Sequence, residues 1–140
     1  MFRWLPLAAM AIGFCVARVQ ANVLYFQGAS PVLDLWNNPA HWYVMDGMGH
    51  LVPAGVLPLA ADTAVITTKA DAQANNIQVN TLILQTGVEV DNGAFIVQTL
   101  QMQQGSHFNG SAITVDSEMD VLGQNCTLTA GTLNITGSAL

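Results

Sequence analysis

The sequence predicts an all-β protein: a parallel β-helix (β-solenoid) with coils of roughly 18 residues, preceded by an irregular Trp/Pro-rich N-terminal cap. Composition is the first observation, since 51% of the residues are hydrophobic and only 9% are charged, with Thr, Asn, Gln, Gly and Val abundant. The second is a repeat, because one valine and one glycine recur every 18 residues: Val79, Val97 and Val115, and Gly87, Gly105 and Gly123. The third is that apolar residues alternate within each unit, as in a strand with one buried face.

Residues 1–21 are interpreted as a secretory signal peptide. Arg3 precedes an apolar run from Trp4 to Ala17, and the segment closes on Val-Gln-Ala, which suits a signal peptidase. The run of 14 residues is shorter than the roughly 20 that a membrane-spanning helix needs. We therefore expect a secreted protein, extracellular or on the cell surface.

The charge of the mature chain excludes two classes of partner. Without residues 1–21, Lys69 is the only lysine or arginine, and it stands against nine acidic residues, for a net charge of −8. Nucleic acids and anionic membrane surfaces are bound through Lys and Arg, so we expect neither as a partner. Cys126 is the only cysteine of the mature chain; it has no intramolecular disulfide partner and is expected to be a small buried side chain.

Residues 22–76 are expected to form an N-terminal strand and a Trp/Pro-rich capping region. Apolar residues at 23–26 followed by Gly28 predict an edge strand and a turn. The stretch LYFQG (24–28) also matches the end of a viral-protease recognition sequence, but Asn22 stands where that sequence has Glu, and we interpret the stretch as the first native strand. Residues 31–76 hold four of the five prolines and two of the three tryptophans, and residues 70–76 are expected to be a linking loop.

Residues 77–140 are expected to be solenoid repeats. Aligning the units VNTLILQTG, VQTLQMQQG and VDSEMDVLG places Thr81 beside Thr99 on neighbouring coils. Asp-Asn-Gly at 91–93 and Phe-Asn-Gly at 108–110 predict further turns, and a fourth unit begins near Cys126. An antiparallel β-sandwich is the alternative, since its turns recur every 8–12 residues. A right-handed solenoid is favoured over a left-handed one, because the strict six-residue apolar period of the left-handed form is missing.

A series of short motifs resembles the sequence of a known protein family. The chain contains, in order, LYFQG (24–28), LWNNPAHW (35–42), VP (52–53), ADTAVI (61–66) and VNTLIL (79–84). The series resembles the N-terminal part of autotransporter passenger domains and related bacterial cell-surface β-helix proteins, and it spans nearly all of residues 22–140. Two departures are Ala61, where the family has Gly, and a longer, more apolar loop at 43–60.

The aromatic residues of the capping region are the candidate contact residues. A solenoid exposes an apolar end with unpaired backbone groups, and a tryptophan pair held by a proline turn can cover it. The rival interpretation is a platform on which sugars stack. The candidate glycan or assembly contacts are Tyr25, Phe26, Trp36, Trp42 and Tyr43.

Residue patterns typical of catalysis or metal binding are missing from the sequence. The histidines lack metal-ligand spacing, and the acids of DSEMD (116–120) lack the spacing and glycine of a calcium loop. A lyase mechanism would need a basic residue to stabilise its anion, and Lys69 alone supplies it poorly. We expect no enzymatic activity, no catalytic or metal-binding residues and no cofactor.

The expected function is that of a secreted, non-enzymatic structural protein of the bacterial cell surface or extracellular matrix, self-assembling into fibres or acting as an adhesin. Its expected partners are further copies of itself, joined through the solenoid ends or the N-terminal strand, and extracellular polysaccharide. The alternative is a carbohydrate-binding or polysaccharide-degrading β-helix module. The C-terminal stretch TLNITGSAL ends inside or just after a coil, and two interpretations stay open. Either the chain is the first part of a longer protein, or this open coil pairs with the next subunit.

Overall fold

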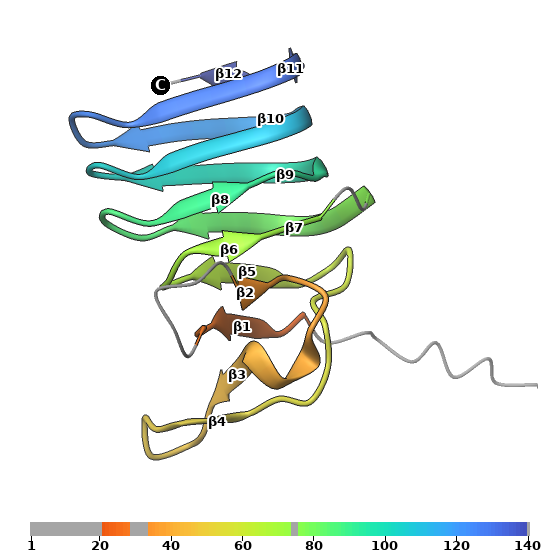
Figure 1. The fold of residues 1–140 in the computed structure, drawn as a ribbon, viewed down its shortest axis with the longest axis vertical. Helices are drawn as coiled ribbons and strands as arrows, with labels where there is room; N and C mark the ends of the chain where they lie inside the picture. The colour runs from red at the N-terminus through yellow and green to blue at the C-terminus, as the bar shows by residue number, and fades with distance from the viewer. Residues whose placement is uncertain (1–20, 29–33, 74–75, 140) are drawn as a thin grey trace, which may run out of the picture.

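The computed structural model describes residues 21–28, 34–73 and 76–139 and has the predicted architecture. It is all-β, with coils about 18 residues apart that stack into a β-solenoid of about four turns. Figure 1 shows the coils stacked along the long axis, with β4 at one end and β11 and β12 at the other. The predicted signal peptide lies outside the described residues, apart from Ala21.

The cap contains four short strands and one helical turn: β1 (Val23–Phe26), β2 (Asp34–Leu35), the 3-10 helix η1 (Pro39–His41), β3 (Trp42–Met45) and β4 (Leu51–Pro53). β1 lies inside the sheet, parallel to β5 on one side and antiparallel to β3 on the other. β4 pairs with β3 in an antiparallel hairpin. The predicted first strand is therefore present, but it is an interior strand and not an edge strand.

The coils are built from eight strands: β5 (Thr63–Ile66), β6 (Ala70–Asp71), β7 (Asn76–Leu84), β8 (Glu89–Asp91), β9 (Ala94–Gln103), β10 (His107–Leu122), β11 (Thr127–Ile135) and β12 (Ser138–Ala139). They pair in parallel and form three faces. One face runs from β5 through the second halves of β7, β9 and β10 to β12. The second runs from β2 through β6 and β8 to the first parts of β10 and β11. The third holds the first halves of β7 and β9, the middle of β10 and the end of β11.

The register confirms the 18-residue repeat over the first coils. Val79 lies beside Val97, and Thr81 beside Thr99, as the alignment predicts. The third unit departs from the alignment, because a register shift between Val115 and Glu118 adds one residue to the coil. Beyond the shift Leu122 pairs with Gln103, and the backbone N–H of Gly105 donates to Gln124 instead of lying beside Gly123.

Three local predictions are corrected by the structure. Coil stacking begins before residue 77, because Thr63 of β5 already pairs with Thr81 of β7. Residues 70–71 form β6 and are not a loop. The turn at 91–93 is present, with Asn92 and Gly93 at positive φ, whereas residues 108–110 continue as β10 without a left-handed residue.

The core is a continuous column that runs through the cap and the coils. Along β9 the inward-facing residues Phe95, Val97, Leu100 and Met102 are at most 1% exposed. Each of these side chains packs against inward-facing residues of the coils above and below, which form one hydrophobic cluster that extends to Phe26 of the cap. Removal of this apolar surface from water is the main stabilising contribution to the stack.

Candidate functional site

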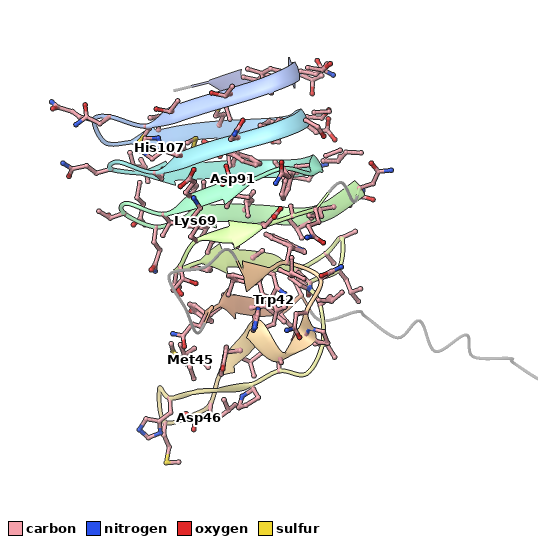
Figure 2. The ribbon with its side chains drawn as sticks, in the orientation of Figure 1. Trp42, Met45, Asp46, Lys69, Asp91 and His107 are labelled. Atoms are coloured by element: carbon pink, nitrogen blue, oxygen red, sulfur yellow. The ribbon has the colours of Figure 1, made fainter. Side chains whose placement is uncertain are left out.

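Three of the five candidate aromatic residues lie in the core. Phe26, Trp36 and Trp42 are 0%, 4% and 0% exposed. The Trp36 and Trp42 rings meet edge to face with centroids 4.8 Å apart, and Phe26 meets Trp42 at 5.1 Å. The indole N–H of Trp42 donates to the backbone oxygen of Trp36 at 2.8 Å, so its one polar group is satisfied although the ring is buried. Figure 2 shows Trp42 inside the cap.

The local sequence explains this arrangement. Pro39 begins η1, where a missing N–H costs nothing, and the Asn38 side chain accepts a hydrogen bond from the N–H of Ala40 at 3.1 Å. The resulting turn brings Trp36 back over Trp42. In the β1–β3 pair, Phe26 lies directly opposite Trp42, so both side chains point to the same, inner side.

The burial of these rings bears on their two expected roles, covering the end of the apolar column and stacking on a sugar. A sugar stacks on an accessible ring face, and neither tryptophan offers one in this structure. Trp36 instead meets Phe95 of β9 edge to face at 5.6 Å, and Phe95 meets Phe108 at 4.8 Å. The tryptophan pair thus covers the apolar column of the coils.

Tyr25 and Tyr43 form the outward-facing part of the candidate set. They lie opposite each other on β1 and β3, and both are partly exposed. Val23, Tyr25 and Met45 line a shallow groove of about 350 Å³ at this surface. β1 itself has partners on both edges, so a second chain would have to displace β3 or β5 to pair with it.

Exposed apolar side chains lie at both ends of the stack and also on its sides. At the cap end lies the turn between β3 and β4, where Met48 is 80% exposed. Figure 2 shows Met45 at this end, beside Asp46. At the opposite end lies the last described coil, where Leu133 of β11 is 47% exposed. Val56 and Leu59, 56% and 62% exposed, belong to the segment that runs from β4 along the side of the stack to β5, where Leu59 lines a groove with Ile77 (Figure 1).

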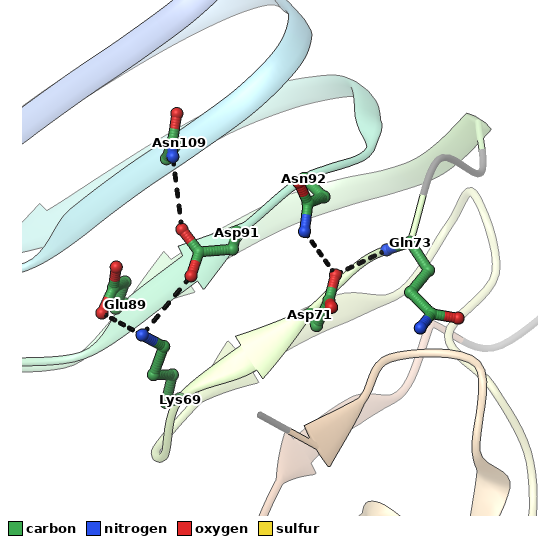
Figure 3. A network of polar contacts seen from close by, with 7 residues as sticks. All are labelled: Lys69, Asp71, Gln73, Glu89, Asp91, Asn92 and Asn109. Atoms are coloured by element: carbon green, nitrogen blue, oxygen red, sulfur yellow. Dashed lines mark hydrogen bonds and ion pairs between the residues drawn. The ribbon is translucent and has the colours of Figure 1, made fainter. Parts of the chain in front are cut away.

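The second face carries a polar network, shown in Figure 3. Lys69 Nζ lies 2.6 Å from Glu89 Oε2 and 3.4 Å from Asp91 Oδ2. Asn109 and Asn92 donate from their Nδ2 atoms to Asp91 and Asp71, at 3.4 and 2.8 Å. The sequence interpretation missed this network, although Asp71, Asp91 and Asn109 follow one another at 20 and 18 residues and lie in register on neighbouring coils.

The ion pairs of this network shift the ionisation of their members. The ammonium of Lys69 donates to Glu89 and holds the pKa of that carboxyl below its usual value, while Glu89 raises the pKa of Lys69. Both side chains are more than one-third exposed, and solvent screens such pairs, so the ion pair contributes little to stability.

The remaining chemistry-bearing residues have local structural contacts. Asp46 accepts hydrogen bonds from the backbone N–H groups of His50 and Met48, each at 2.8 Å, which lower its pKa and hold the 46–50 turn. Cys126 is half-buried, packs against the core, and its thiol donates to the backbone oxygen of Gln103 at 3.1 Å. Within residues 21–28, 34–73 and 76–139, no three His, Cys, Asp or Glu side chains are grouped to hold a metal.

Comparison of the chain with family models, curated proteins and solved structures finds no match. The resemblance to autotransporter passenger domains therefore stays a prediction. In the part of the chain that the structure describes, no helix is long and apolar enough to span a membrane.

Proposed function

We propose that this chain is a secreted, non-enzymatic structural protein of the bacterial cell surface or extracellular matrix, and that its copies join end to end. The observation that carries the proposal is the exposed apolar surface at both ends of a regular β-solenoid. A scaffold of this kind needs a rigid repeating body and two complementary ends.

Among the described residues, the coil formed by β11 is the outermost one at one end of the stack. Leu133 lies in register beside Ile113 and therefore points inward like it, but Ile113 is 0% exposed and Leu133 is 47% exposed. The difference arises because inward-facing residues of a solenoid are covered only by the next coil. Among the described residues β11 pairs only with β10, so its other edge can accept a further strand.

The cap provides a different kind of end. Its outermost strand, β4, contains Pro53, which has no N–H to donate to a ladder. Contacts at this end would therefore be made by the turn between β3 and β4, through Met48. Because the two ends differ, their contact is heterologous and does not close on itself, and repeating it gives a filament.

The test measures association of residues 22–140 by sedimentation velocity and negative-stain electron microscopy. We expect the unmodified protein to form concentration-dependent end-to-end oligomers. Leu133→Asp and Met48→Asp place a charge at one end each and should weaken association at least about tenfold, since burying an unpaired charge is costly.

Ile96→Asp is the matched control, because Ile96 is 43% exposed but lies on the side of the stack. It should associate like the unmodified protein. A monomer at every concentration would refute the proposal, as would an equal loss of association in Ile96→Asp. Met48 lies in an exposed turn, so its variant stays informative even if Leu133→Asp loosens the last coil.

A further inference from the structure

A groove lies on the side of the stack, at the corner where β8 turns into β9. It is open to solvent, has a volume of about 570 Å³ and is lined by Gln73, Asn92, Gly93, Asn109, Gly110 and Ser111. Figure 3 shows three of these residues around the carboxylates of Asp71 and Asp91. The groove is separate from both ends and from the buried tryptophan pair.

Small residues that are closely packed against their surroundings make this corner hollow. Asn92 and Gly93 have φ values of 63° and 77°, which turn the chain between β8 and β9. A Cβ on Gly93 would lie 2.6 Å from the Cβ of Ala72, and one on Gly110 would lie 2.9 Å from Cγ1 of Ile113. Inward packing therefore requires both glycines, and at their positions the groove is lined by backbone.

Hydrogen bonds orient three of the polar side chains of the groove, those of Asn92, Asn109 and Ser111. Asn92 and Asn109 each donate from Nδ2 to a carboxylate, Asp71 and Asp91 respectively. A carboxylate only accepts, so it fixes the nitrogen end of each amide, and the amide oxygen of Asn109 lies on the opposite side (Figure 3). Ser111 Oγ donates to the backbone oxygen of Gly93 at 2.9 Å and keeps its lone pairs free to accept.

We propose that this groove binds a neutral glycan. Amides and hydroxyls donate and accept hydrogen bonds, as sugar hydroxyls do, and such groups held in place in advance bind at a lower entropic cost. An anionic ligand is disfavoured by Asp71 and Asp91 beside the groove. A cation would have to compete with Lys69, which already contacts Glu89 and Asp91.

The spacing of the groove favours a chain of sugars over a single sugar. Asn109 pairs in register with Asp91, so Asn92 and Asn109 come from neighbouring coils. Neighbouring strands lie about 4.8 Å apart, so polar groups repeat along the stack at roughly the length of one sugar unit. The proposal does not depend on assembly, because the groove lies on the side of the stack.

The test is calorimetric titration of residues 22–140 with mannohexaose, cellohexaose and laminarihexaose as neutral probes and hexagalacturonate as the anionic probe. We expect at least one neutral probe to bind, and Asn109→Ala to weaken its binding about tenfold through the loss of one or two hydrogen bonds. Asn92→Gly suits the positive φ of its position and should produce a similar loss.

Gln98→Ala is the matched control, because the Gln98 amide likewise donates to a carboxylate of the next coil, Asp116, at 3.3 Å, but lies outside the groove. It should leave binding unchanged. The proposal is overturned if no neutral probe binds, if hexagalacturonate binds more tightly, or if Gln98→Ala weakens binding as much as Asn109→Ala. Sedimentation of the same variants should match the unmodified protein, which separates this result from the test of assembly.

Discussion

Replacement of Phe95 by alanine should be among the most destabilising single changes in the coils. The Phe95 side chain is 1% exposed and meets Trp36 on one side and Phe108 on the other. Core Phe→Ala changes cost about 3–5 kcal/mol. We expect about 4–5 kcal/mol here, because each lost aromatic contact adds about 0.5–1.5 kcal/mol in paired rings. The backbone hydrogen bonds to the neighbouring coils also prevent the structure from collapsing into the cavity that the missing ring would leave.

The assay is urea denaturation of residues 22–140 followed by tryptophan fluorescence, which then comes from Trp36 and Trp42 alone. Phe95→Leu keeps most of the volume and should cost about 1–2 kcal/mol. Ile96→Ala, at a half-exposed neighbouring position, should change the free energy of unfolding by about 0.5 kcal/mol or less. Trp36 should also become more accessible to acrylamide in Phe95→Ala. If Phe95→Ala lowers the free energy of unfolding by less than about 1 kcal/mol, the view that the aromatic contacts of Phe95 join the cap to the coils is refuted.

Two further predictions concern the turns and the ion pair. Gly93→Ala should destabilise the protein by about 2–4 kcal/mol, because the added Cβ would clash with Ala72 and the residue would also have a left-handed φ. Gly87→Ala should cost only about 1–2 kcal/mol, because Gly87 has a φ of 71° but open space around it. Thermal unfolding of the two variants should show this order. Since Lys69 lowers the pKa of Glu89, the pair stabilises the protein above pH 4.5, the usual pKa of that carboxyl, and this contribution is lost as pH falls through the lowered pKa. Glu89→Gln should therefore lose less stability than the unmodified protein between about pH 5.5 and about pH 3, and equal losses would contradict the assignment.

The fold could be predicted because the solenoid repeats one geometry. Each coil needs the same inward residues at the same offset, so Val79 and Val97 mark the register and the alternation marks the buried side. In β1 the same alternation distinguishes the buried Phe26 from the partly exposed Tyr25. The Trp36–Trp42 turn has no such period, and its rings could be assigned to the core only from the structure.

The bulge of the third coil could not be predicted, because nothing in the apolar pattern marks it. The extra residue lies among Asp116, Ser117 and Glu118, which are all exposed, so an insertion there leaves the inward positions unchanged. The groove was missed for a related reason. Asn92-Gly93 and Asn109-Gly110 were interpreted as turns alone, and only the stacking of coils brings their amides together.

The pairing of β1 with β5 has a consequence for the order of folding. Neighbouring coils join residues 18 to 20 positions apart, as Val79 with Val97 and Phe108 with Leu128, whereas Leu24 joins Ala64 across 40 positions. Closing the longer loop costs about 0.7 kcal/mol more in chain entropy. We therefore expect folding to nucleate at the coils of β7 and β9 and to propagate one coil at a time. β1 should join the sheet late and complete the cap.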